Sequence, residues 1–385
     1  MSDRRLLMIP GPIELEPDVL TALGERTRSH MDAGFADAFG RALDRMRGVF
    51  LAGKDAQPFI LAGSGTLAMD SAVANLVEPG DAAVVVDTGY FSARMADALG
   101  RWGARVTRVG AALGDAPALE AVEAAVARER PAVVTITHVD TSTGVRTDVA
   151  ALARVARAHG ALVVVDGVCS VGAEELRHEA WGLDVTLTAS QKAIGAPPGL
   201  ALLVASPRAV EKARARKARV ASMYLDWAEW LPIMRSYEER KPQYFATPAV
   251  NLVAALDVSL GQLLAEGMEA RFARHARIAG AFRAAWKALE LTPLTARDEV
   301  AANTLSALYY PAGVDASLVG KVAAQGVVVA GGLHPDARTK YFRVGHMGAC
   351  SPNDVLATVG AIERALAAAG HARKGAQAAS DALAR

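Results

Sequence analysis

Short runs of apolar, often β-branched residues alternate with longer amphipathic segments through the first two thirds of the chain. The runs predict strands at residues 58–61, 82–86, 132–137, 161–165 and 185–188. The amphipathic segments predict helices at residues 67–76, 92–102, 118–128 and 149–158. Because the runs are continuously apolar rather than alternating, they are typical of a parallel sheet that is covered on both faces. The pattern therefore predicts an α/β fold with a largely parallel sheet.

The pattern changes after Thr247 and Pro248. A long helical segment that includes Gly267 is predicted from about residue 251 to residue 289, and shorter segments of mixed type follow it. We expect three parts, namely an N-terminal arm (residues 1–15), a large domain (16–255) and a smaller C-terminal α/β domain (256–385). The residues from about 371 onward are expected to form a fraying helix or a disordered tail.

The composition is that of a globular protein, because 52% of the 385 residues are hydrophobic and 22% are charged. The 42 basic and 41 acidic residues nearly cancel, so no nucleic-acid partner is expected. A basic segment at residues 207–220 is interpreted as the solvated face of a helix. The two cysteines lie far apart and form no CxxC pair, which favours a reducing compartment. Since the apolar runs are too short for a signal peptide or a membrane span, we expect a cytoplasmic protein.

Residues 62–68 read Ala-Gly-Ser-Gly-Thr-Leu-Ala and follow a predicted strand at the start of a predicted helix. Glycines let the backbone approach an anion, and the first N–H groups of a helix attract it, which favours a phosphate site. The same spacing occurs in dinucleotide-binding folds, and Asp87 ends the next strand at a distance that suits this alternative. The glycines are also compatible with tight packing of strand against helix and no ligand at all.

Two charged residues occupy positions where burial is expected. Asp166 ends a predicted strand, at the sheet edge where open α/β folds bind ligands, and a buried carboxylate requires a cationic partner. It is also compatible with a capping role in the following turn. Lys192 lies among small residues before a Pro-Pro-Gly turn, where desolvation would lower its pKa towards the nucleophilic range, although most lysines are simply solvated. No HExxH motif or clustered His and Cys spacing occurs, so no metal site is predicted.

These three segments together match the three chemical handles of pyridoxal 5′-phosphate (PLP). The anion-binding segment suits the phosphate, Asp166 suits a protonated pyridine nitrogen, and Lys192 suits the aldehyde. An enzyme that uses a nicotinamide cofactor would not require the pair of acid and lysine. The combination therefore favours PLP as the cofactor.

Longer strings of residues carry a resemblance to a known family. These strings are residues 9–12, 57–66, 137–144, 188–197, 244–248, 329–334 and 342–348. Over nearly the whole chain, the sequence resembles the class V, fold-type I PLP-dependent aminotransferases of the alanine–glyoxylate/serine–pyruvate family, and it is most similar to their fungal type. The resemblance implies a large domain with a mostly parallel seven-stranded sheet flanked by helices, and a smaller C-terminal α/β domain.

The resemblance also implies roles for residues around the cofactor ring. Lys192 would bind the cofactor covalently and, once displaced by substrate, would carry a proton as the general base. Asp166 would keep the pyridine nitrogen protonated. Phe91 would stack on the ring, Val168 would pack on the opposite face, and Thr141 would approach the phenolic oxygen.

Further residues would bind the phosphate and the substrate. The resemblance assigns the phosphate to Ser64, Gly65, Thr66 and Gln191 and, from a neighbouring subunit, to Tyr244 and Thr247. It thus implies a homodimer with shared active sites, although Tyr244 is also compatible with packing in the core. Arg343 would bind the substrate carboxylate through a bidentate guanidinium, and the turn that contains Gly11 would close over the substrate.

The implied reaction is a ping-pong transamination between a small L-amino acid, with alanine as the first candidate, and glyoxylate, which yields pyruvate and glycine. Serine or another amino donor is an alternative. Two other interpretations stay open, a nicotinamide-binding oxidoreductase and a non-catalytic PLP-binding protein, although the latter would not need Arg343. Cys169 lies in a tight turn rather than on a mobile loop, so desulfurase chemistry is not favoured.

Overall fold

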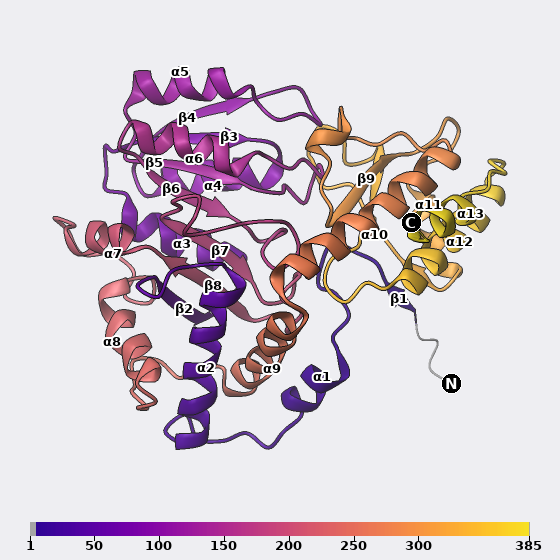
Figure 1. The fold of residues 1–385 in the computed structure, drawn as a ribbon. Helices are drawn as coiled ribbons and strands as arrows, with labels where there is room; N and C mark the ends of the chain where they lie inside the picture. The colour runs from indigo at the N-terminus through magenta and orange to yellow at the C-terminus, as the bar shows by residue number, and fades with distance from the viewer. Residues whose placement is uncertain (1–4, 385) are drawn as a thin grey trace.

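The computed structural model describes residues 5–384, and a seven-stranded sheet forms its larger part (Figure 1). The strands lie in the order β2 (Gln57–Ala62), β8 (Leu200–Ala205), β7 (Val185–Ala189), β6 (Leu162–Asp166), β5 (Val133–Thr137), β3 (Ala82–Asp87) and β4 (Arg105–Gly110). Strand β8 runs antiparallel to both of its neighbours, and the other neighbouring pairs are parallel. The prediction of a largely parallel, seven-stranded sheet is therefore confirmed.

Two strands of this sheet are absent from those that the apolar runs predict. Strand β4 lies at the sheet edge, and two exposed arginines interrupt its half-buried residues, so it contains no continuous apolar run. Strand β8 is fully buried and wholly apolar, but it follows directly on a turn rich in proline and glycine. The edge position of β4 is set by tertiary pairing, which local patterning does not report, whereas the apolar run of β8 is a local signal that our predictions did not use.

The large sheet is buried on both faces. In β3, Ala83 and Val85 belong to the core on one face, whereas Val84 and Val86 belong to the core on the other. The first face is covered by α2 (Ala33–Val49), α3 (Gly65–Leu76), α4 (Tyr90–Arg101), α7 (Pro207–Arg214), α8 (Trp227–Glu238) and α9 (Val250–Glu266). The second face is covered by α5 (Leu119–Glu129) and α6 (Val149–Ala158), and α1 (Pro17–Leu23) packs on α9. Helices on both faces explain why the strands are continuously apolar.

A smaller group of elements lies beside the large sheet, on the orange-to-yellow side of Figure 1. Its antiparallel sheet has the order β11 (Ala330–Gly331), β12 (Tyr341–Gly345) and β9 (Leu305–Tyr309), and a parallel pair joins β1 (Leu6–Leu7) to β10 (Val327–Val328). The surrounding helices are α10 (Met268–Ala288), the 3₁₀ turn Asp298–Val300, α11 (Ser317–Ala324), α12 (Pro352–Ala367) and α13 (Ala376–Leu383). This group has a core of its own.

The long helical segment predicted for residues 251–289 is present as two helices. Helices α9 and α10 are separated at Gly267, whose φ of 84° is a left-handed conformation that glycine adopts without strain. Residue 255, where we expect the large domain to end, lies inside α9, and the division into arm and domains stays a prediction. Residues 1–4 of the expected arm and residue 385 of the expected small domain lie outside the described residues.

Two helical predictions need correction near the ends of their segments. Up to residue 384 the tail contains a packed helix rather than a frayed or disordered one, because α13 packs on α10 and α12 and buries Ala379. The N–H groups of Gly375 and Ala376 donate to Glu363 at 3.0 and 3.3 Å, which fixes the start of α13. The helix predicted for residues 207–220 ends already at Arg214, since the following residues form turns and bends.

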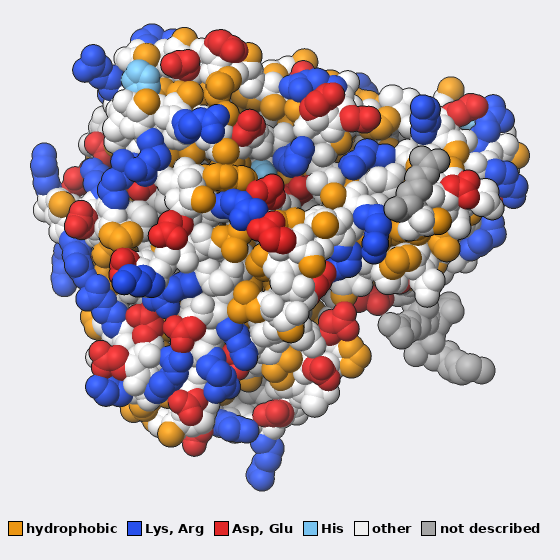
Figure 2. All heavy atoms as spheres, in the orientation of Figure 1, with side chains coloured by type: hydrophobic (Ala, Val, Ile, Leu, Met, Phe, Trp, Pro, Cys, Tyr) orange, Lys and Arg blue, Asp and Glu red, His pale blue; other side chains and the backbone are white. Residues whose placement is uncertain are grey.

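The surface carries charges of both signs. On the face that Figure 2 shows, basic and acidic side chains are interspersed among apolar ones, as the nearly balanced composition leads us to expect. Among residues 5–384, no helix combines the length and the apolar character that crossing a bilayer requires.

Candidate active site

The residues singled out from the sequence gather at one edge of the large sheet. Because β2 is parallel to β7, the strands β2, β3, β5, β6 and β7 all end at this edge. The segments that follow these ends hold Ser64, Gly65, Thr66, Phe91, Thr141, Val168, Gln191 and Lys192, and Asp166 is itself the last residue of β6. Open α/β sheets bind their ligands at this edge.

Lys192 is buried, with 9% of its surface exposed, and its Nζ donates to the backbone oxygen of Pro10. Burial lowers the pKa of Lys192, and nearby Arg343 lowers it further, while Cys169 and Asp166 act in the opposite direction. The neutral amine is therefore favoured more than in a solvated lysine, and a neutral amine is the form that attacks a carbonyl or accepts a proton.

Asp166 is 3% exposed and accepts a hydrogen bond from the N–H of Val168 at 2.9 Å. Burial raises its pKa to about 7, the charge on Asp140 raises it as well, and the Val168 hydrogen bond and Lys192 lower it. A carboxylate so placed is stabilised by a cation within reach. A protonated pyridine nitrogen is such a group.

The start of α3 has the donors that an anion requires. The side chain of the N-cap residue Ser64 makes no hydrogen bond to the helix. The first N–H groups of α3 therefore lack a side-chain cap. Gly65 has no room for a larger residue, because a Cβ there would lie 2.9 Å from Cγ2 of Val168. The amide of Gln191 has a buried Oε1 without a hydrogen-bond partner among the described residues. An amide has donors as well as an acceptor, so its rotation would turn an N–H towards a phosphate oxygen.

Asp140 is a structural residue of the site that the sequence predictions leave out. Its carboxylate is fully buried and accepts hydrogen bonds from the N–H groups of Phe91 (3.0 Å) and Ser92 (3.2 Å) and from Ser142 N–H (2.9 Å) and Oγ–H (2.6 Å). It thereby joins the start of α4, which carries Phe91, to the loop that carries Thr141. A charged residue just beyond the end of a buried strand is the signal that identified Asp166, and it applies equally to Asp140.

Arg343 reaches the same site from β12. Its Nε donates to the backbone oxygen of Gly331 at 2.9 Å, and Nη1 donates to that of Thr141 at 3.0 Å. These bonds hold the guanidinium in place and leave the N–H groups of Nη2 for an anion. Burial lowers the pKa of Arg343, but an arginine remains cationic in proteins.

Tyr341, two residues before Arg343, organises the loop beside it. Its hydroxyl donates to the backbone oxygen of Ser142 and accepts from the N–H groups of Leu333 (2.8 Å) and His334 (2.9 Å). Because residues i and i+2 of a strand lie on one face, the position of Tyr341 next to Arg343 is a signal in the sequence that our predictions did not use.

The N-terminal segment covers Lys192. Gly11 has a φ of 91°, and a Cβ at this position would lie 2.5 Å from Cδ of Lys192. The N–H of Ile13 donates to the backbone oxygen of Gln191 at 3.2 Å. Gly11 therefore lies against Lys192, and its closing over the substrate stays a prediction.

Tyr244 and Thr247 are the two predicted residues that stand apart from this cluster in the single chain. Both are exposed, Tyr244 to 60%, and the ring of Tyr244 contacts His30 at a centroid distance of 5.4 Å. Tyr244 is thus not a core residue of the single chain.

Cys169 is buried beside the site, and burial raises the pKa of its thiol. A buried thiol with a raised pKa is a poor nucleophile. Within residues 5–384, no three His, Cys, Asp or Glu side chains gather in a way that would hold a metal ion.

A family model described as aminotransferase class-V matches residues 19–347 of the chain. The chain belongs to the class-V aminotransferase family. It is 39% identical over 361 residues to alanine–glyoxylate aminotransferase 1 of Saccharomyces cerevisiae, which covers 90% of this chain and 93% of that protein. It is 33% identical over 373 residues to an L-aspartate–glyoxylate aminotransferase of Paracoccus denitrificans, with 95% and 92% covered.

A solved structure agrees with this assignment. Pyridoxamine–pyruvate aminotransferase from Mesorhizobium loti matches with a TM-score of 0.93 and 29% identity, covering 100% of this chain and 98% of that chain. The protein is therefore an aminotransferase with the fold-type I architecture, and its cofactor is PLP. The resemblance drawn from the sequence is confirmed, and the nicotinamide-dependent and non-catalytic interpretations are set aside.

Proposed function

We propose that this aminotransferase moves the amino group of a small L-amino acid, alanine first among them, to glyoxylate, forming pyruvate and glycine in two half-reactions. The observation that carries the proposal is the convergence of Lys192, Asp166 and Arg343 at one edge of the sheet. The similarity to the yeast alanine–glyoxylate aminotransferase supports the choice of substrates.

When bound, PLP supplies an aldehyde that takes up an amino group and a conjugated ring that stabilises a carbanion. The residues fit the three parts of this cofactor. Lys192 would hold its aldehyde carbon, Asp166 its pyridine nitrogen, and the start of α3 with Gln191 its phosphate, while Phe91 and Val168 would pack on the ring and Thr141 would face its phenolic oxygen.

Three residues of the chain would then act on the substrate. Arg343 binds the carboxylate through the N–H groups left by its two backbone contacts, which sets the orientation of Cα. Burial lowers the pKa of Lys192. Its amine would accept the proton from Cα of the amino acid and deliver it to the carbon atom of the cofactor's aldehyde. The turn at Gly11 lies over Lys192 and excludes water from the amine.

The amino donor is the less defined part of the proposal. All α-amino acids have the carboxylate that Arg343 would bind, so this contact does not distinguish between donors. Apolar pocket walls discriminate between donors that differ by one methylene by only about 10- to 200-fold. The relative from Paracoccus is named for aspartate, and serine remains the alternative that the sequence suggests.

The test is the visible spectrum of the purified enzyme as amino and oxo acids are added. We expect a cofactor band that bleaches with L-alanine and returns with glyoxylate. Arg343→Met is the matched control, because it should keep the band but require at least about 30-fold more alanine to bleach it, as expected when one partner of a charged pair is lost. A band that ignores alanine but answers serine or aspartate would replace the donor, and a protein with no band after PLP is added would contradict the function.

We further propose that the enzyme is a cytoplasmic homodimer in which Tyr244 and Thr247 of one subunit complete the phosphate site of the other. The exposure of Tyr244 supports this, because a large ring on a surface loop is typical of a surface that another chain covers. We expect light scattering to give a dimer mass and Tyr244→Ala to weaken PLP binding about tenfold. A monomer with unchanged PLP affinity would contradict the dimer.

A further inference from the structure

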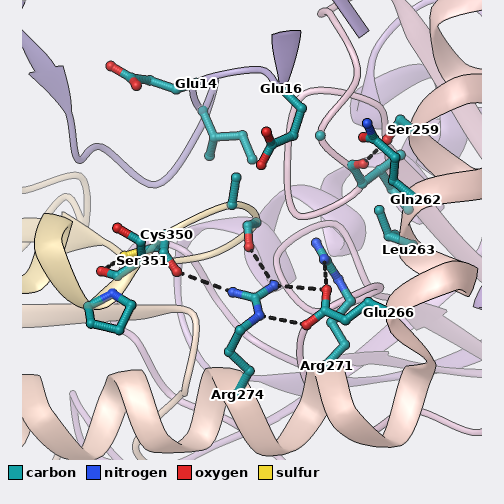
Figure 3. A pocket seen from close by; sticks show the side chains of 16 residues that line it. Glu14, Glu16, Ser259, Gln262, Leu263, Glu266, Arg271, Arg274, Cys350 and Ser351 are labelled. Atoms are coloured by element: carbon teal, nitrogen blue, oxygen red, sulfur yellow. Dashed lines mark hydrogen bonds and ion pairs between the residues drawn. The ribbon is translucent and has the colours of Figure 1, made fainter. Parts of the chain in front are cut away.

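A cluster of charged side chains, labelled in Figure 3, lies where α9 meets α10. It contacts the loop that carries Lys192 through Arg271. Its centre is Arg271, which is only 5% exposed. The guanidinium donates in three directions, from Nε to the backbone oxygen of Gly172 (2.5 Å), from Nη2 to that of Ala193 (2.9 Å) and from Nη1 to Glu266 (2.7 Å).

The two carbonyls that Arg271 contacts belong to the segments that follow Lys192 and Asp166 in the candidate active site. Ala193 directly follows Lys192, and Gly172 lies in the turn that follows Asp166. One guanidinium thus links the backbone just after Lys192 to the backbone of the turn that follows Asp166. Because a guanidinium is planar and rigid, it fixes the separation of the groups that it joins.

The Lys192 loop is held by hydrogen bonds at four successive carbonyls. The oxygen of Gln191 accepts from Ile13 N–H (3.2 Å), and that of Lys192 accepts from Gly195 N–H (2.8 Å). The oxygen of Ala193 accepts from Arg271, and that of Ile194 accepts from the hydroxyl of Ser259 in α9. Three of these four donors come from outside the loop.

A cavity of about 340 Å³ adjoins the loop at Ile194 and Gly195. Its other walls come from the N-terminal segment, α9, α10 and residues 348–352. Arg271 and Ser259 line the same cavity, so the loop is held on this side by their hydrogen bonds as well as by the buried side chain of Ile194.

The same stretch of α10 also holds the segment that follows β12. Arg274 donates to Glu266 and to the backbone oxygens of Gly348 (3.0 Å) and Cys350 (3.2 Å), as Figure 3 shows for the last of these. His275 accepts from Gly348 N–H at Nε2 (3.0 Å), and its Nδ1 therefore donates to the oxygen of Arg271 (2.8 Å). Since this segment directly follows β12, which carries Arg343, one helical turn contacts both the lysine loop and the segment next to the carboxylate clamp.

We propose that Arg271 is a positioning residue for amino transfer, which fixes the Lys192 loop against the Asp166 turn and, through Glu266 and Arg274, against the segment that follows β12. It touches neither substrate nor cofactor and acts through Lys192. The proposal rests on the role that the proposed function gives to Lys192.

The test compares holoenzymes carrying Arg271→Met or Arg271→Lys with the wild type. Loss of the guanidinium lets the Lys192 nitrogen shift, so Arg271→Met should lower kcat by about tenfold or more and leave the KM for the amino donor within about twofold. The pH midpoint of the visible band of the lysine-bound cofactor should also shift, because it depends on the setting of that nitrogen. Arg271→Lys, which keeps the charge but reaches fewer of the three acceptors, should give intermediate values.

Arg208→Met is the matched structural control. Arg208 also donates to a carboxylate, Asp184, and to a backbone oxygen, that of Ala161, but it does so at the opposite end of β6 and β7. This variant should lose stability while keeping the wild-type pH midpoint and kcat.

The outcomes separate the two proposals. An Arg271→Met enzyme that loses stability as Arg208→Met does, with wild-type kcat and pH midpoint, would overturn the positioning role. If Arg271→Met does not fold, Arg271→Lys decides, since intermediate values support the role and wild-type values overturn it. A wild-type protein without the cofactor band would instead overturn the proposed function.

Discussion

Replacing Lys192 with alanine is expected to lower kcat by about 10⁴-fold, because the variant loses the group that carries the proton to and from Cα. It should also lose the covalent link to the cofactor, so that PLP is removed by gel filtration. Single-turnover assays with alanine and glyoxylate, together with the visible spectrum after filtration, measure both effects.

The control for this variant is Lys287→Ala, which removes an exposed lysine of α10 and should keep wild-type activity. Added methylamine should restore part of the lost rate to Lys192→Ala, since it supplies a small amine in the space that the side chain leaves. Activity of Lys192→Ala within tenfold of the wild type would show that another base carries the proton.

Replacing Asp166 with asparagine is expected to lower kcat by about 100-fold, because a neutral amide does not keep the pyridine nitrogen protonated. A second effect follows from the pKa of about 7 that burial produces. In protein depleted of cofactor, the folded state keeps a proton that the unfolded state loses above its ordinary pKa of 3.8. The Asp166 contribution to the free energy of unfolding is therefore fully present below that value and is lost as pH rises through about 7, by at most about 1.4 kcal/mol per pH unit.

Urea unfolding at several pH values between about 5 and 8 measures this contribution as the difference between wild type and Asp166→Asn. We expect the wild type to lose stability relative to the variant as pH rises, and added PLP to restore it. Parallel pH profiles of the two proteins would show that Asp166 is not the titrating group.

Much of the fold and site is predictable from the sequence, because the signals are local. Continuous valine-rich runs indicate strands buried on both faces, and Asp166 and Lys192 stand out as charges next to such runs. The parallel arrangement of the strands then brings their carboxyl ends to one edge, which explains why residues as far apart as Ser64 and Lys192 lie at the same edge of the sheet.

Other features depend on contacts between distant segments and leave no local signal. The hydrogen bonds that Asp140 accepts from Phe91 and Ser92, and those that Arg271 donates to Gly172 and Ala193, join residues 48 to 99 positions apart. Strand β4 is set by its pairing with β3 rather than by its own polar sequence. The shared phosphate site that we propose for Tyr244 requires a second chain, so neither the sequence pattern nor the single chain tests it.

The antiparallel pairing of β8 with β7 limits which insertions the chain accepts near Lys192. Strands β7 and β8 are joined directly, without a crossover helix, and Ser190 closes the connection by donating to Pro197 O (2.6 Å) and accepting from Leu200 N–H (3.2 Å). One residue added between these strands would disturb a connection in which Ser190 and the backbone oxygens of residues 191–194 are all hydrogen-bonded. We therefore expect the ten residues 190–199 to keep their number, and natural insertions and engineered tags to be accepted outside this connection.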